Sequence, residues 1–183
     1  MKTNDAIAKL KDAGQQGMQV LSRADLATLL GFDHSNRLGR LLRILVEAAA
    51  LERVAKGVYV NHLATPRRGY LIEEIACVLR REETNYVSLE SILSEFGVIS
   101  QIMISRITVM TTGRGGIFET PYGTIEFTHT KRRPEAVLAR TVDMPGRPLR
   151  IATKKTGVAD LRRVGRNTYM INPDELESDE IGR

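Results

Sequence analysis

Residues 22–61 decide the fold of the first third of the chain, and they read SRADLATLLGFDHSNRLGRLLRILVEAAALERVAKGVYVN. Ser22, with Asp25 three residues later, forms the pattern of an N-terminal capping box, so we expect a helix to begin there. Gly31 ends the apolar stripe of that helix, and after a short turn Ser35 is the expected N-cap of the next one. This succession of N-cap, terminating glycine and second N-cap predicts two helices joined by a tight turn.

The second of these helices, predicted for residues 36–50, separates apolar from basic residues. At about 100° per residue, its leucines share one face with Val46, Ala48 and Ala49. The opposite face carries Asn36, Arg37, Arg40, Arg43 and Glu47. Arginines in the first turns oppose the helix macrodipole, each by about a few tenths of a kcal/mol, and a guanidinium that faces an anion offsets this cost. A helix, a tight turn and a helix with basic N-terminal residues is the helix-turn-helix arrangement of DNA-binding proteins.

Two short apolar segments follow, LERVA (51–55) and VYVN (58–61), around Lys56-Gly57. This pattern predicts a β-hairpin, and a hairpin after a recognition helix is the wing of a winged helix. The alternative is a helical bundle with a solvated arginine face and an incidental hairpin. In the winged-helix interpretation, base edges and phosphates are contacted by Arg23, Ser35, Asn36, Arg37, Arg40, Arg43, Arg53 and Lys56.

The flanking segments complete the predicted domain organisation. Residues 5–13 predict a short first helix, with Gly14 as its left-handed C-terminal cap. The stretch ATPRRG (64–69) is typical of a linker because Pro and Gly punctuate it. We therefore predict an α+β protein in which residues 1–66 form a winged helix-turn-helix DNA-binding domain. Residues 67–183 form a mixed α/β domain with an antiparallel sheet.

The elements predicted for this second domain come from changes of periodicity. Helices are expected at 70–81 and 88–96, then three strands within 106–130 separated by Gly-rich turns. Residues 131–150 are expected to be irregular. We also predict a last helix at 152–163 and a strand at 166–172.

The chain resembles AbiEi-type antitoxins in two stretches. The first is YVSLESILSEFGVIS (86–100) followed by ITVMTTGRGGIFETPYGTIEFTHT (107–130), and the second is IATKKTGVADLRRVGRNTYMINPDEL (151–176). The resemblance implies a winged helix that binds its own promoter and a C-terminal domain that provides antitoxicity. It also implies a nucleotidyltransferase-like toxin, encoded by an adjacent gene, as the protein that is counteracted. A plain winged-helix regulator with a ligand-sensing or dimerising C-terminal domain is the alternative.

Charge is segregated along the chain, whose net charge is +5. Residues 1–68 carry 11 basic and 6 acidic residues, and residues 131–166 carry 11 and 3, whereas the segments after each are acidic. Basic blocks attract polyanions through counterion release, so nucleic acid is the first partner to consider. The second block predicts another basic surface, for DNA, RNA or an acidic partner, unless the protein's own acidic segments neutralise it. Its residues are Lys131, Arg132, Arg133, Arg147, Arg150, Lys154, Lys155, Arg162 and Arg163.

The sequence shows little that suggests catalysis, so we predict a protein that is not an enzyme and takes no cofactor. One cysteine, Cys77, excludes a multi-Cys metal site and is expected to be a buried structural thiol. Glu90 and Glu95 lie five residues apart on one predicted helix and are not aligned as a catalytic pair. The first residues contain no apolar segment and no apolar run approaches 18 residues, so we expect no membrane span and a cytoplasmic location.

Overall fold

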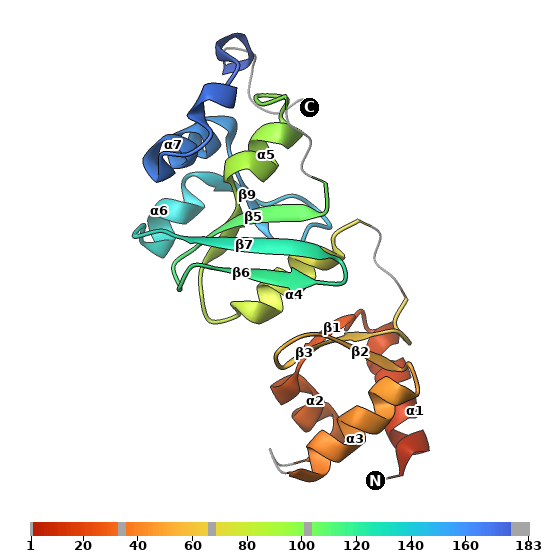
Figure 1. Ribbon diagram of the computed structural model, residues 1–183. Coiled ribbons are helices and arrows are strands. Elements are labelled where there is room, and N and C mark those ends of the chain that lie inside the picture. The colour runs from red at the N-terminus through yellow and green to blue at the C-terminus, as the bar shows by residue number, and fades with distance from the viewer. Residues whose placement is uncertain (1, 33–35, 66–68, 101–103, 177–183) are drawn as a thin grey trace. The chain divides into compact units, whose positions relative to one another are not determined.

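The computed structural model describes residues 2–32, 36–65, 69–100 and 104–176 (Figure 1). The chain divides into two compact units, Met1–Leu79 and Arg80–Arg183. Both units combine helices with sheet, so the protein is of the mixed α+β class. The domain boundary predicted at residues 66 and 67 lies outside the described residues, and the helix that follows it belongs to the first unit.

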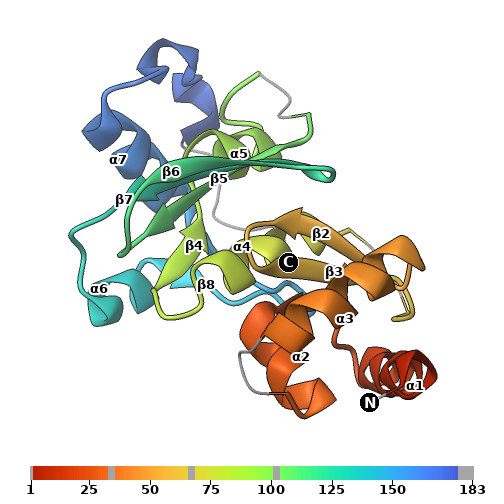
Figure 2. The ribbon, with the colours of Figure 1, turned by 60° about the horizontal axis from the view of Figure 1, so that its bottom comes forward.

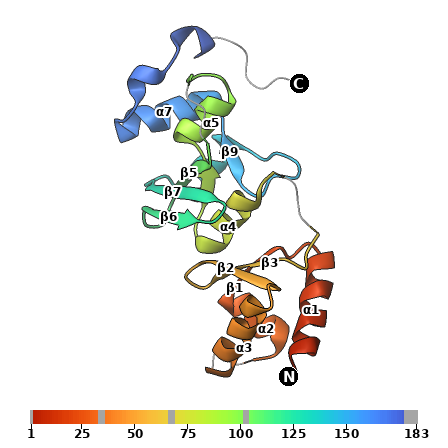
Figure 3. The same cartoon turned by 45° about the vertical axis from the view of Figure 1, so that its right-hand side comes forward.

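The first unit contains three helices packed against one another and against a three-stranded antiparallel sheet of order β1-β3-β2 (Figure 3). A fourth helix joins this unit through contacts with β1 and β3. The elements are α1 (Thr3–Gln15), β1 (Val20–Ser22), α2 (Arg23–Leu30), α3 (Asn36–Glu47), β2 (Leu51–Ala55), β3 (Val58–Asn61) and α4 (Leu71–Leu79).

The predicted helices and hairpin of residues 22–61 are confirmed, with the expected local causes. The Ser22 hydroxyl accepts a hydrogen bond from the Asp25 amide at 3.1 Å, and the Asp25 carboxylate accepts one from the Ser22 amide at 2.8 Å. Gly31 ends α2 in the left-handed conformation, with φ of 71°. Gly57 has φ of 77° in the turn between β2 and β3, where glycine adopts this conformation without strain. These signals act within a few residues, which is why the sequence revealed them.

The core of the first unit is built from leucines of four elements. Leu10, Leu26, Leu38, Leu45 and Leu51 are all almost completely buried. Burying a leucine side chain contributes about 2 kcal/mol, so this cluster fixes how α1, α2, α3 and β2 pack together.

The prediction that Val46, Ala48 and Ala49 extend the buried face of α3 is wrong. All three are exposed. Ala48 and Ala49 lie beyond the end of the helix at Glu47, and Ala49 adopts a left-handed conformation with φ of 54°, whereas Val46 is 37% exposed within the helix itself. The prediction also omitted β1, a strand of only three residues whose pairing with β3 makes β3 the central strand of the sheet.

The second unit contains a six-stranded sheet of order β6-β7-β5-β4-β9-β8. Helices α5 and α7 pack against each other, and α5 also contacts β5 (Figure 2). The elements are β4 (Asn85–Val87), α5 (Leu89–Glu95), β5 (Arg106–Thr111), β6 (Gly116–Thr120), β7 (Gly123–His129), α6 (Pro134–Leu138), β8 (Thr141–Val142), β9 (Arg150–Ala152), α7 (Lys154–Val164), and the 3₁₀ helices η1 (Thr168–Met170) and η2 (Pro173–Leu176).

The three strands predicted within residues 106–130 are present, but the sheet is mixed rather than antiparallel. Strand β7 lies between β6 and β5. It forms an antiparallel hairpin with β6 and pairs in parallel with β5. Strands β4 and β9 are also parallel. The sequence gives the strands but not the path of the connections, so the pairing directions were missed.

Two further predictions for the second unit are wrong. Residues 131–150 were expected to be irregular, yet they contain α6 and β8. The predicted strand at 166–172 is instead the short helix η1, preceded by Asn167 with φ of 55°. In this segment one isolated bridge joins Ile171 to Ile99. None of the helices in the described part of the chain is both long and apolar enough to cross a membrane.

Gly14 is not the left-handed cap that its position predicted. It lies inside α1, and a Cβ atom added to it would stand 2.5 Å from the Cα atom of Ala64. Glycine is therefore needed here because the backbone of residue 64 approaches the helix closely.

Replacing Gly14 with alanine should destabilise the protein, although alanine is the better helix former. Because the backbone at Ala64 must move, we expect a net loss of about 1–3 kcal/mol, measured by chemical denaturation. Gly39 in α3 is the matched control, since its added Cβ would have no neighbour closer than 3.8 Å. Gly39→Ala should gain up to about 1 kcal/mol. Equal effects of the two substitutions would contradict the close approach at Gly14.

Candidate nucleic-acid interface

Helix α3 presents a row of arginines on the side opposite its buried leucines. Arg37, Arg40 and Arg43 are all exposed, and their spacing of three residues places them on neighbouring turns. The side chains that anchor the other side of the helix are those of Leu38, Leu41, Leu42 and Leu45. The buried leucines thus determine which way the guanidinium groups point.

No carboxylate in the described part of the chain neutralises these arginines. Among the described residues, no hydrogen bond or ion pair reaches the side chains of Arg37, Arg40, Arg43 or Lys56. Lys56 is exposed in the turn of the β2–β3 hairpin. The positive charge of this surface is therefore open to an external anion.

Beside α3 lies a hollow of about 470 Å³ that brings together three arginines from three elements. They are Arg23 from α2, Arg43 from α3 and Arg53 from β2, and we call this hollow the arginine groove. The remaining lining residues are Gly39, Leu42, Val46, Glu47 and Tyr59. Three guanidinium groups around one opening suit a phosphate, which accepts hydrogen bonds on several oxygens.

Local contacts place two of the three arginines at the groove. The backbone amide of Arg23 donates to the carbonyl of Gly57 at 2.8 Å, which ties the start of α2 to the hairpin turn. The Nε atom of Arg53 donates to the carbonyl of Ala55 at 3.4 Å, across the irregular register of β2. The arginine groove is therefore built by the hairpin and α2 as much as by α3.

Two of the residues predicted to bind DNA are not described in the structure. Ser35 lies outside the described residues, and Asn36 begins α3 without a described side chain. Ile44, which is 45% exposed on α3, was not among the residues predicted to bind DNA. Its helical position, four residues after Arg40 and seven after Arg37, was the available signal.

The second basic block is divided between residues with partners and residues without them. Arg147 binds the Glu95 carboxylate at 2.7 Å, and Arg150 donates two hydrogen bonds to Thr141. Within the described residues, the exposed side chains that have no such partner are those of Lys131, Arg133, Lys155 and Arg162.

Asp160 organises the most buried part of this block. Its carboxylate is fully buried, forms an ion pair with Arg132, and accepts hydrogen bonds from Tyr86 at 2.9 Å and Ser88 at 2.8 Å. Burial and the negative charge of Asp160 raise the pKa of Tyr86 to about 12, so this hydroxyl remains a hydrogen-bond donor. Arg163 lies 3.6 Å from the same carboxylate. Part of the predicted basic surface therefore holds the interior of the second unit together.

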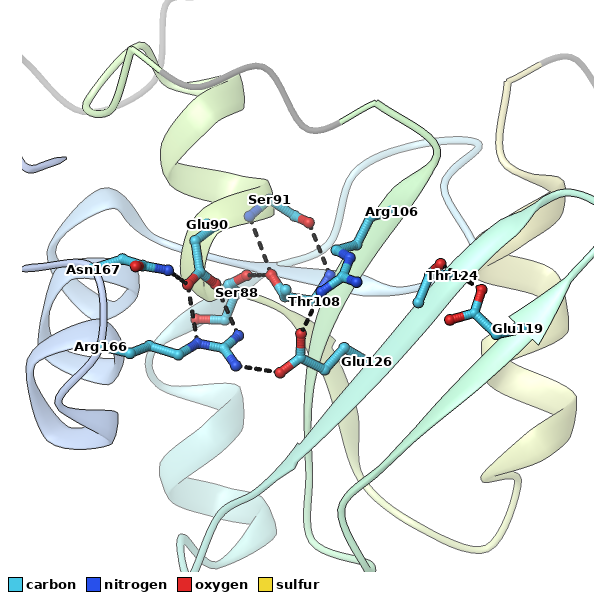
Figure 4. A network of polar contacts seen from close by, with 10 residues as sticks. All are labelled: Ser88, Glu90, Ser91, Arg106, Thr108, Glu119, Thr124, Glu126, Arg166 and Asn167. Atoms are coloured by element: carbon cyan, nitrogen blue, oxygen red, sulfur yellow. Dashed lines mark hydrogen bonds and ion pairs between the residues drawn. The ribbon is translucent and has the colours of Figure 1, made fainter.

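A second buried carboxylate, Glu90, joins α5 to the segment after α7 (Figure 4). Arg166 donates to both Glu90 oxygens, at 2.9 and 3.0 Å, and Asn167 donates to one at 2.8 Å. Arg166 also contacts Glu126, which binds Arg106 at 3.2 Å. Burial alone would raise the pKa of Glu90, but the hydrogen bonds from Arg166 and Asn167 hold it below its ordinary value. The sequence carried no signal for this network, because its members are up to 77 residues apart.

The described residues offer little basis for metal binding or nucleophilic catalysis. No group of three or more His, Cys, Asp or Glu side chains in the described ranges is arranged to hold a metal ion. Burial, together with the nearby Glu73 and Glu74, raises the pKa of the Cys77 thiol to about 11, so it is poorly suited to act as a nucleophile. No known family model and no curated protein matches the chain, so the resemblance to AbiEi-type antitoxins stays a prediction.

Glu90→Gln should destabilise the second unit by about 2 kcal/mol, because it removes charge-assisted hydrogen bonds from Arg166. The pKa of Glu90 is lowered on folding, so its stabilisation is present above the unfolded value and is lost as pH falls through the folded one. The difference in unfolding free energy between wild type and variant should be full at neutral pH and shrink below pH 4.5. Urea unfolding across this range measures it.

Glu135→Gln is the matched control, since Glu135 is exposed and has no side-chain partner among the described residues. It should change stability little at any pH. A loss for Glu90→Gln that stayed constant down to pH 3 would contradict the ionic role of the carboxylate.

Proposed function

We propose that the first unit is a winged helix-turn-helix that binds double-stranded DNA and represses its own operon. The observation that carries this proposal is the row of exposed arginines on α3, which have no partner among the described residues, with the arginine groove beside it. The order of elements, helices α2 and α3 followed by the β2–β3 hairpin, supports the same assignment.

The geometry suits the major groove of B-DNA. A helix with its side chains is about 10–12 Å across, and the groove is about 12 Å wide. In this proposal α3 enters it, and Asn36, Arg37 and Arg40 contact base edges. Arg43 lies at the flank of α3 and lines the arginine groove, where it binds a backbone phosphate together with Arg23 and Arg53. Lys56, at the hairpin turn, binds a further phosphate as part of the wing.

We also propose that the protein is the antitoxin of a toxin–antitoxin system and acts by binding rather than by catalysis. The resemblance of residues 86–100, 107–130 and 151–176 to AbiEi-type antitoxins supports this part of the proposal. The second unit, Arg80–Arg183, would counteract a nucleotidyltransferase-like toxin encoded by an adjacent gene.

Arg40→Ala and Lys56→Ala should weaken DNA binding in different ways. Arg40→Ala should cost about 1–3 kcal/mol and relax sequence preference, because a base contact is lost. Lys56→Ala should weaken binding to all sequences alike and reduce the salt slope by about one, because a phosphate contact is lost. Fluorescence anisotropy with a duplex from the region upstream of the gene measures both.

Lys11→Ala removes an exposed cation of α1 and serves as the control. It should leave both affinity and sequence preference unchanged. The assignment of α3 as the recognition helix fails if Arg40→Ala behaves like this control.

The antitoxin activity should survive the loss of DNA binding. A full-length variant with Arg37, Arg40 and Arg43 all replaced by alanine should still restore growth when co-expressed, from an independent promoter, with the product of the adjacent gene. If neither this variant nor the wild type restores growth, the protein is a winged-helix regulator without antitoxin activity. If the wild type restores growth and the triple variant does not, the arginines of α3 are needed for antitoxin activity as well as for DNA binding.

A further inference from the structure

Ile44 lies within the row of basic residues on α3. Arg37, Arg40 and Ile44 are separated by three and four residues, so their side chains follow one strip of the helix surface. Ile44 is 45% exposed, while Leu41 and Leu45 beside it are buried. The strip therefore presents two guanidinium groups followed by a branched aliphatic side chain.

The fold of the first unit does not explain this side chain. The core takes its contacts with α3 from Leu38, Leu41, Leu42 and Leu45. A single exposed aliphatic residue is ordinary on a protein surface and by itself indicates nothing. Ile44 is informative because its neighbours along the strip are the residues that would read base edges. A ligand that engages Arg37 and Arg40 would also cover Ile44.

We propose that Ile44 is a specificity-determining residue that contacts the 5-methyl group of a thymine in the major groove. This inference rests on the proposed DNA-binding function. Thymine is the standard base whose major-groove edge presents a methyl group, and apolar side chains recognise it. At the other edges an aliphatic side chain would cover hydrogen-bonding atoms without replacing their lost contacts with water.

The helical rise limits the distance to this thymine. Four residues of helix advance about 6 Å, whereas neighbouring base pairs are about 3.4 Å apart. The thymine should therefore lie no more than about two base pairs from the base contacted by Arg40.

Replacement of thymine by deoxyuridine tests the proposal, because it removes the methyl group alone. The probe is a duplex selected by the full-length wild type from a randomised pool, with each thymine replaced in turn by deoxyuridine. At one thymine the replacement should weaken wild-type binding about fourfold, the value expected for one buried methyl group. Ile44→Ala should bind the thymine and deoxyuridine duplexes equally.

Ile117→Ala is the matched control, since it makes the same change at an isoleucine that is 61% exposed on β6 of the second unit. It should keep the wild-type ratio between the two duplexes. The proposal is overturned if the wild type binds every deoxyuridine duplex as tightly as the thymine duplex. It is also overturned if Ile44→Ala discriminates between the two duplexes as strongly as the wild type does. Failure of the wild type to select any duplex would instead overturn the proposed function itself, so the two failures are distinguishable.

Discussion

Helix α3 is divided into a buried leucine side and an exposed arginine side, and this division sets the arrangement of the first unit. Leu38 and Leu45 are fully buried against the other elements of the unit, so rotating the helix would expose them to water. Because these leucines cannot turn outward, the arginines cannot turn inward. The position of the basic residues is thus fixed by hydrophobic packing, at a cost to helix stability that an external anion would offset.

The two basic blocks of the sequence have different fates in the structure. In the first unit, the arginines of α3 are exposed and, among the described residues, unpaired. In the second unit, Asp160 and Glu90 bind Arg132 and Arg166 inside the fold. A buried carboxylate without a cation would carry a large desolvation cost, so these arginines are needed where they are. The number of basic residues in the second block is therefore larger than the number that the second unit can offer to a partner.

Sequence reasoning succeeded where the determining interactions are local. Helix α2 begins directly after Ser22, which caps it through hydrogen bonds with Asp25 three residues away, and Gly57 supplies the left-handed conformation of the hairpin turn. It failed for the pairing of β5 with β7 and for the partners of Asp160, since these depend on residues brought together by the whole fold. At the candidate site, the helical periodicity of the sequence predicted that the arginines of α3 share one face of the helix. The arginine groove did not, because it needs Arg23, Arg43 and Arg53 from three separate elements.

We propose that the arginines of α3 bind duplex DNA, and the dependence of binding on salt concentration tests this proposal. Affinity for the upstream duplex is measured at several salt concentrations for the wild type and for the variant with alanine at positions 37, 40 and 43. We expect the variant to bind at least about a hundredfold more weakly at fixed salt and to show a shallower dependence on salt concentration. Equal affinity and an unchanged salt slope would contradict it.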